Sequence, residues 1–237
     1  AAPPPQVGVV TLQPQSFTLT SDLPGRTSAF RIAEVRPQVN GIILKRMFKE
    51  GSDVKAGQQL YQIDPSIYEA TLKSAEANLR STKSISDRYR QLVDEQAVSR
   101  QEYDTAVANR LQSEAALQSA QINVRYTKVY APLTGRIGRS SVTEGALVSN
   151  GQLEAMAVIQ QLDPIYVDVT QSSVELLELR RELESGRLQK AGDNAAKVKL
   201  TLEDGSQYKL DGKLEFSEVS VDQTTGSVTL RAVFPNP

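Results

Sequence analysis

Small and hydrophobic side chains recur at alternating steps of four and three residues along two stretches of the chain. This spacing keeps them on one face of an α-helix and is typical of the seam of a coiled coil. Between Asp64 and Lys128 the only glycine or proline is Pro65, and the segment is rich in good helix formers such as Ala, Gln, Glu, Leu, Lys and Arg. The seam residues are Tyr68, Leu72, Ala75, Leu79, Thr82, Ser86, Tyr89 and Val93, then Ser99, Tyr103, Ala106, Arg110, Ser113, Leu117, Ala120, Val124 and Thr127. The pattern predicts two antiparallel helices, each about 45 Å long.

Capping signals give the bounds of these helices. Ser66 with Glu69 and Ser99 with Glu102 both have the capping-box spacing, in which a serine and a glutamate bind each other's backbone N–H groups. The stretch from Glu95 to Val98 is therefore the turn between the helices. Few large apolar residues lie in the distal half of the seam, so we expect the tip to be the weaker part. A hairpin this thin either bends or packs sideways against copies of itself.

A repeat flanks the helical segment. Gly41, the pair Glu50-Gly51, Val54 and the pair Gly57-Gln58 all recur 94 residues later, because 135 − 41, 144 − 50, 148 − 54 and 151 − 57 give the same offset. Glycine accepts the backbone angles of tight turns, so the pattern predicts two copies of one small β unit. A half of about 30 residues is too small to hold a core alone, so the halves must meet in space. The alternative is two unrelated hairpins that share turn residues.

The rest of the chain has a β pattern. Ile165–Val169 is rich in β-branched and aromatic residues, and Ser172 with Glu175 marks a third capping box, which opens a helix ended by Gly186. Further strands are predicted around Asp-Gly turns. They are Lys197–Leu202, Tyr208–Leu210, Lys213–Val221 and Val228–Phe234, with Ser16–Thr20 closing a small β-barrel and Val7–Leu12 left without an evident partner.

These elements predict a mixed α and β, elongated, multidomain protein. A long antiparallel helical hairpin is inserted in a β-sandwich, and a small antiparallel β-barrel with one short helix follows. Short connections between the modules, near residues 64–65, 128–129, 29–30 and 163–164, are expected to act as hinges. The predicted domains are 1–15 (a linker and an orphan strand), 16–30 with 164–237 (β-barrel), 31–65 with 129–163 (the two halves of the β-sandwich) and 66–128 (hairpin).

Composition argues against an enzyme. The chain has 237 residues with 27 basic and 28 acidic side chains, a net charge of −1, which gives no general attraction for nucleic acid. It has no cysteine and no histidine, so disulfides, thiolate nucleophiles and zinc sites built on these residues are excluded. The carboxylate pairs Glu203-Asp204 and Asp94-Glu95 lie at predicted turns, where solvated acids are ordinary. We expect no catalytic, cofactor or metal site.

Several long motifs resemble one family, the periplasmic adaptors, or membrane fusion proteins, of tripartite multidrug efflux pumps of the resistance-nodulation-division (RND) type, as in AcrA and MexA. The resemblance covers essentially the whole chain. Its motifs are Leu23–Thr27, Ile32–Val39, Phe48–Val54, Thr143–Val148 and Gln161–Val169.

This resemblance implies that the β-sandwich is lipoyl-like and that residues 1–15 hold the orphan strand of an incomplete membrane-proximal domain. It also implies a non-enzymatic subunit in the periplasm of a Gram-negative bacterium. It would link an inner-membrane RND transporter to a TolC-like outer-membrane channel and assemble into a ring, a trimer or a hexamer. The family's N-terminal lipid anchor has no cysteine to carry it here, so the anchor would be absent or upstream. At the hairpin tip, Arg88, Leu92 and Ser99 match the spacing of the family's channel-contacting residues.

Each of these three residues also has a purely structural interpretation. Ser99 caps a helix in any case, Arg88 is compatible with a solvated surface charge, and Leu92 is compatible with packing across the hairpin. Two other functions stay open at this point. One is an adaptor for an ABC-type exporter. The other is a lipoyl or biotinyl carrier domain, which is disfavoured because the helical insert occupies the turn where such domains present a lysine.

Overall fold

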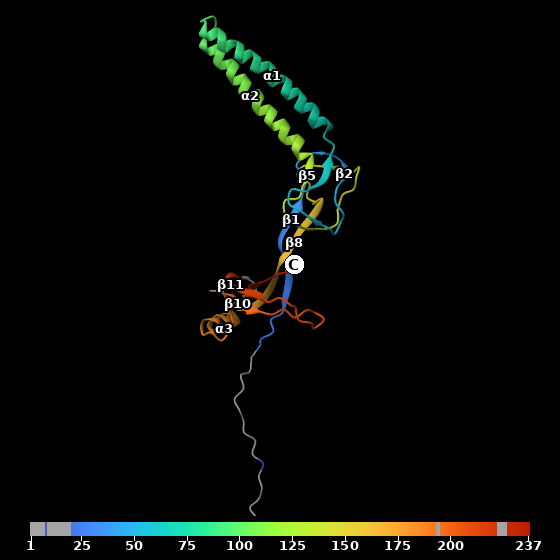
Figure 1. Cartoon of the computed structure of the whole chain (residues 1–237), viewed down its shortest axis with the longest axis vertical. Helices are drawn as coiled ribbons and strands as arrows, with labels where there is room; N and C mark the ends of the chain where they lie inside the picture. The colour runs from blue at the N-terminus through green and yellow to red at the C-terminus, as the bar shows by residue number, and fades with distance from the viewer. Residues whose placement is uncertain (1–7, 9–19, 193–194, 222–226) are drawn as a thin grey trace, which may run out of the picture.

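The protein is described by a computed structural model that covers residue 8 and residues 20–192, 195–221 and 227–237. Figure 1 shows an elongated molecule with two long helices at one end, a β module in the middle and a second β module with a short helix. The predicted strands Val7–Leu12 and Ser16–Thr20 lie outside the described residues, apart from Gly8 and Thr20.

The described elements follow each other along the chain as shown in Figure 1, and most strands of the first module are short. They are β1 (Gly25–Val35), β2 (Gly41–Arg46), β3 (Asp53–Val54), β4 (Gln59–Ile63), α1 (Ser66–Asp94), α2 (Arg100–Tyr126), β5 (Lys128–Tyr130), β6 (Gly135–Ile137), β7 (Leu147–Val148), β8 (Ala157–Ser172), α3 (Ser173–Glu184), β9 (Lys190–Gly192), β10 (Ala195–Val198), β11 (Gly212–Val221) and β12 (Ser227–Phe234).

The two repeat halves bind each other reciprocally. Gly41 in β2 pairs with Val148 in β7, and their repeat equivalents Gly135 in β6 and Val54 in β3 pair in the same way. The two glutamates of the repeat also accept hydrogen bonds from the opposite half. The N–H of Arg46 donates to Glu144 at 3.0 Å, and the N–H of Ser140 donates to Glu50 at 3.1 Å. Each half therefore supplies hydrogen bonds that the other lacks, and the prediction that the halves meet is confirmed.

The core of this first module lies between the two halves. Tyr61, Ile63, Ile137 and Ile159 are fully buried there. The hydroxyl of Tyr61 donates to the Met156 carbonyl at 3.1 Å and lies 2.6 Å from the Ser140 hydroxyl, and burial raises its pKa despite the Ser140 hydrogen bond. The buried hydroxyl of Tyr61 therefore has hydrogen-bond partners within the apolar core, so its burial leaves no polar atom unsatisfied.

A pair of long strands joins the first module to the second. The strands β1 and β8 are antiparallel, and β8 continues without a break through Asp163 and Pro164. At this point the ladder shifts register, because Phe30 alone lies between the partners of Ile165 and Gln161. Residues 29–30 and 163–164 are therefore a bulge within the paired strands and not a separate segment, since pairing on both sides keeps the two strands together. The hinge expected at this place stays a prediction.

The second module is built on the far half of β8. There β12, β11, β10 and β9 follow β8 in the sheet, and α3 packs against a core that includes Leu230 and Phe234. The predicted strand Tyr208–Leu210 is wrong. Only a bridge joins Thr201 to Gln207, and backbone hydrogen bonds of 2.8 Å beside it link the Tyr208 N–H to the Leu200 carbonyl and the Leu202 N–H to the Ser206 carbonyl. The Tyr208 hydroxyl donates to the Pro235 carbonyl at 2.9 Å.

Candidate partner-docking surface

The helices α1 and α2 lie side by side along their length (Figure 1). Their least exposed side chains follow the alternating steps that the sequence predicted. In α1 the seam residues are all buried or half-buried, and the only other residue in that class is Leu92. In α2 the buried residues are Ala106, Ser113 and Ala120, each of which belongs to the seam. The contact between the helices is thus made mostly by small side chains, which permits a close approach.

Polar atoms interrupt the middle of this seam. Ser86 and Ser113 are buried, and the side-chain amide of Asn78 donates to the Ser113 hydroxyl at 3.1 Å. The Nε atom of Arg110 is buried and has no hydrogen-bond partner. A shifted register would lose the hydrogen bond between Asn78 and Ser113 that joins the two helices, although the Ser113 hydroxyl would keep its bond to the Asn109 carbonyl at 2.9 Å.

The two helices begin differently. Ser99 caps α2, with its hydroxyl accepting from the Glu102 N–H at 3.2 Å and Glu102 binding the Ser99 N–H at 2.9 Å. The Glu102 carboxylate also accepts from the Ser99 hydroxyl at 2.9 Å, and the bonds that it receives from the Ser99 backbone and then from this hydroxyl lower the pKa of Glu102. The capping box predicted for Ser66 and Glu69 is wrong, because α1 has no such side-chain cap.

At the start of α1 the carboxylate of Asp64 takes the capping role. It accepts from the Ser66 hydroxyl at 2.6 Å and from the Ser66 N–H at 3.0 Å, and both hydrogen bonds lower the pKa of Asp64. The Ser66 hydroxyl is directed to Asp64 and the residue is already inside the helix, so it is not available as the cap.

The turn at the tip is short and closed by backbone hydrogen bonds. The N–H of Ala97 donates to the Leu92 carbonyl at 2.8 Å, and Gln96 has a left-handed φ of 57°. Arg88 and Ser99 are exposed, while Leu92 is half-buried. Arg88 and Leu92 follow Ile85 by three and seven residues, so these three lie on one stripe of α1. Ser99 lies beyond the turn, at the start of α2.

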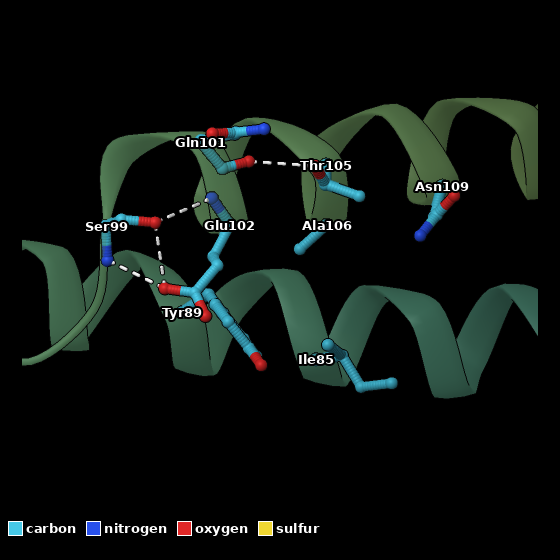
Figure 2. Close-up of a pocket in the computed structure, with 8 residues that line it drawn as sticks. All are labelled: Ile85, Tyr89, Ser99, Gln101, Glu102, Thr105, Ala106 and Asn109. Atoms are coloured by element: carbon cyan, nitrogen blue, oxygen red, sulfur yellow. Dashed lines mark hydrogen bonds between the residues drawn. The ribbon is translucent and has the colours of Figure 1, made fainter.

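Beside the tip a shallow groove of about 500 Å³ lies between the helices (Figure 2). Of the predicted contact residues, only Ser99 lines it. Figure 2 shows Ser99 and Glu102 close together at one end of the groove and Ile85 and Asn109 farther along it. Four groove residues were not predicted from the sequence, because the prediction covered only the seam and the tip. They are Ile85, Gln101, Thr105 and Asn109. Their positions close to seam residues were the feature of the sequence that could have indicated them.

Other kinds of site have no counterpart in the described residues. Within these ranges no three His, Cys, Asp or Glu side chains are grouped so that they could hold a metal ion. Among the described helices, none is both long enough and apolar enough to cross a membrane.

Comparisons with known proteins assign the two β modules. Residues 31–160 match the family model of the RND MFP barrel-sandwich hybrid domain, and residues 164–237 match that of the RND MFP β-barrel domain. The chain is 77% identical over 237 residues to the multidrug/solvent efflux pump periplasmic linker protein MepA of Pseudomonas putida. It is 71% identical over 240 residues to the multidrug resistance protein MexA of Pseudomonas aeruginosa.

Both alignments include all of this chain, which spans 62% of the length of MepA and 63% of that of MexA. Among solved structures, a MacA-MexA chimeric protein with the Pseudomonas aeruginosa MexA α-hairpin domain is similar. Its TM-score is 0.72 at 32% sequence identity, over 90% of this chain and 74% of the chimera.

Proposed function

Because the chain belongs to the membrane fusion proteins of RND efflux systems, we propose that it is part of a periplasmic adaptor that links an inner-membrane RND drug transporter to a TolC-like outer-membrane channel. Similar proteins are named as efflux pump periplasmic linkers, which supports this role and a periplasmic location. We propose attachment to the inner membrane as the orientation that such a link requires. The adaptor would perform no chemistry, since its task is to hold two partners in place.

The arrangement of α1 and α2 is the observation that carries this proposal. Helix α1 starts and α2 ends at the first β module, where Asp64 N–H donates to the Ile42 carbonyl and Ile63 N–H donates to the Thr127 carbonyl, both within 2.9 Å. A rigid base with two packed helices is suited to present a tip at a distance. We propose that residues 66–128 act as one coiled-coil hairpin that reaches toward the channel.

The modules would divide the work. We propose that residues 31–65 and 129–163 form the lipoyl-like base of the hairpin. The β-barrel of residues 16–30 and 164–237 would face the transporter, and residues 1–15 would belong to a membrane-proximal domain. The two separate buried cores, one around Tyr61 and one around Leu230, support this division.

At the tip we propose that Arg88, Leu92 and Ser99 contact the channel. Arg88 is exposed and can donate up to five hydrogen bonds, and Leu92 offers a half-buried apolar surface. Ser99 has a capping role as well, so its contact role has to be separated from capping. Replacement of Ser99 by Asn keeps a good helix cap and changes the surface.

The test is crosslinking in cells from a photoreactive residue at position 92 to candidate outer-membrane channels. We expect a product with the channel, and we expect Arg88→Asp to abolish this product. In a chain without the photoreactive residue, Arg88→Asp and Leu92→Asp are expected to abolish drug resistance. The matched control is Arg80→Asp, an exposed charge on the same helix. Unchanged crosslinking in the folded Arg88→Asp variant, together with unchanged resistance in the folded double variant Arg88→Asp, Leu92→Asp, would refute the docking proposal.

A further inference from the structure

The repeat contains the same tight turn twice, at residues 55–58 and at residues 149–152. In both turns the carbonyl of the first residue accepts from the N–H of the fourth, at 2.9 Å and 3.2 Å. The fourth residue is a glutamine, and its side-chain oxygen accepts from the N–H of the first residue at 3.1 Å in both. The third residue is Gly57 or Gly151, with φ of 80° and 81°. The two turns therefore share their geometry, and a difference in their chemistry has to come from the residues within them.

The turns differ at the residue before the glycine and at the glycine N–H. In the first turn this residue is Ala56, and the Gly57 N–H donates to the Ala131 carbonyl at 2.9 Å. In the second turn it is Asn150, and both Asn150 and Gly151 are exposed. Within the part of the chain that the structure describes, neither the side-chain amide of Asn150 nor the N–H of Gly151 has a hydrogen-bond partner. A Cβ atom at Gly151 would meet no other atom within 4 Å.

An asparagine followed by a glycine can react with its own backbone, because glycine has no side chain to keep its nitrogen away from the amide. The Gly151 nitrogen attacks Cγ of Asn150, its proton passes to a solvent base, and the side-chain nitrogen leaves as ammonia. A succinimide ring results. Water then opens the ring at one of its two carbonyls, which gives aspartate or isoaspartate, in which the main chain continues through Cγ. In total, water replaces ammonia and no other reactant is consumed.

The chain contains one other Asn-Gly pair, Asn40–Gly41. Here the backbone nitrogen lies in a paired strand. The Ile43 N–H donates to the Ala146 carbonyl at 2.9 Å, and residues of an antiparallel strand alternate in the direction of their hydrogen bonds, so the Gly41 N–H also points into the ladder, where Gly41 pairs with Val148. Gly41 is half-buried. Its nitrogen therefore has to leave the ladder before it can reach the Asn40 amide.

The two Asn-Gly pairs lie in contact with each other. The Asn150 N–H donates to the side-chain oxygen of Asn40 at 2.7 Å, which also restrains the Asn40 amide. The backbone carbonyl of Asn40 accepts from the hydroxyl of Tyr68 in α1, again at 2.7 Å. Figure 1 shows β2, which begins at Gly41, next to the base of the helices. The turn of residues 149–152 is therefore connected to the start of α1 through Asn40.

We propose that Asn150 is a site of spontaneous covalent modification, at which the folded chain converts itself to the aspartate and isoaspartate forms while Asn40–Gly41 is protected. Isoaspartate adds one methylene group to the main chain inside the turn that the Gln152 N–H closes on the Ser149 carbonyl. The longer main chain loosens the turn and its contact with Asn40. The reaction requires no partner protein, so its test is independent of the proposed adaptor role.

Peptide mapping of the purified chain by mass spectrometry compares the two pairs within one molecule. Trypsin releases residues 140–180 and 32–45, each with a single asparagine, at positions 150 and 40. After incubation in neutral buffer, Asn150 is expected to convert at least about tenfold faster than Asn40, because the opening of one ladder hydrogen bond corresponds to about this factor. In urea the two rates are expected to become similar. Equal rates in the folded chain, or a faster reaction at Asn40, would overturn the proposal.

Asn150→Ala is the matched variant, since it gives the second turn the residue that Ala56 supplies in the first. No conversion of residues 140–180 is expected in this variant. After incubation, the Gly41 N–H of the parent chain is expected to lose about tenfold in protection from hydrogen exchange, as the loss of one hydrogen bond implies, and that of Asn150→Ala is expected to keep it. Equal protection in the two incubated chains would refute the loosening at Asn40.

Asn150→Asp separates the altered main chain from the new charge, because aspartate adds the carboxylate and leaves the main chain unchanged. Freshly purified Asn150→Asp is expected to keep the protection of Gly41 within about twofold of the fresh parent chain. A loss as large as in the incubated parent would assign the effect to the charge and overturn the role of isoaspartate.

Discussion

Asp168 illustrates how single residues stabilise the second module. Partial burial raises the pKa of this carboxyl, but hydrogen bonds from Arg231 at 2.7 Å and Ser28 at 2.8 Å outweigh burial, so its pKa lies below the ordinary value of 3.8. A carboxyl whose pKa is lowered by folding stabilises the protein above its unfolded pKa. This contribution is lost as the pH falls through the folded pKa.

Asp168→Asn is therefore expected to lower the free energy of unfolding by about 1 kcal/mol at pH 7. The difference from the parent chain should shrink as the pH falls below about 4, the unfolded pKa of aspartate. Urea unfolding at several pH values measures it. Asp211→Asn is the control, since its ion pair with Lys197 is about 40% exposed on both sides and contributes little. A difference that stays constant down to pH 2 would contradict this account.

Gly135 shows why the repeat requires glycine at one of its positions. A Cβ atom there would lie 2.3 Å from the Gln160 carbonyl oxygen in the neighbouring strand. Gly135→Ala is expected to destabilise the chain by about 2 kcal/mol or more, because backbone atoms must move apart. Gly138→Ala is the control, with its nearest atom at 3.4 Å. Equal thermal midpoints for the two variants in calorimetry would show that the strands can separate without cost.

At the scale of residues, the sequence pointed to helix-capping motifs, but it did not show which other side chains compete for the same hydrogen bonds. The capping boxes at Ser99 and Ser172 are confirmed, and the same spacing at Ser66 is not. Asp64, two residues before Ser66, competes for the serine hydroxyl and takes the cap. Spacing alone cannot distinguish these cases. Which residue caps the helix depends on the path of the chain, because this path decides which side-chain oxygen lies within hydrogen-bond distance of the first N–H groups.

At the scale of elements, polar residues in the seam of α1 and α2 favour one alignment of the two helices but lower the stability of their contact. Arg110 lies at a seam position with its Nε buried and without a partner. Arg110→Leu is expected to raise the thermal midpoint of the helical signal, with a gain of about 1 kcal/mol, because an unsatisfied polar atom is replaced by apolar contact. Arg80→Leu, at an exposed position of α1, should change the midpoint little. A lower midpoint for Arg110→Leu would mean that its guanidinium is stabilising.

Elements with strong periodicity were predictable, and those that depend on tertiary contacts were not. The seam positions follow from steps of four and three, which the helix geometry fixes. The strand expected at Tyr208–Leu210 had the right alternation, but the Tyr208 ring packs edge-on against Phe234, 6.4 Å between centroids. The groove beside the tip was missed because its shape depends on how two helices meet, and most of the residues that line it are polar and so add nothing to the hydrophobic pattern.

At the scale of the whole molecule, the repeat made the central prediction possible. A shared offset of 94 residues required the two halves to meet, and the reciprocal pairs Gly41–Val148 and Val54–Gly135 show that they do. The strand is not interrupted at residues 163–164, and the hinge expected there stays a prediction. A proline and a change of pattern suggest a break, but β1 pairs with β8 on both sides of it, so the strand continues.

The junction between the modules is instead a braced bulge. The N–H of Asn236 donates to the Asp163 carboxylate at 3.0 Å, and its side-chain amide donates to the Leu162 carbonyl at 3.1 Å. Beside the bulge, the Phe30 and Tyr166 rings pack 5.1 Å apart, and Arg231 lies 4.5 Å above the Tyr166 ring. These contacts connect β1, β8 and the segment after β12 at the bulge, where the pairing of β1 with β8 is interrupted.

Removal of this brace should therefore loosen the angle between the modules without unfolding either core. We expect Asn236→Ala to broaden the distance distribution between spin labels at positions 128 and 178, on β5 and α3, measured by pulsed electron paramagnetic resonance. Both labels attach to introduced cysteines in a chain that has none of its own. Gln152→Ala, which removes side-chain hydrogen bonds within the first module alone, is the control and should leave the distribution unchanged. A distribution as narrow in Asn236→Ala as in the parent would show that the paired strands alone fix the angle between the modules. Any motion that the proposed transporter partner transmits to the hairpin would then have to occur at the base of α1 and α2.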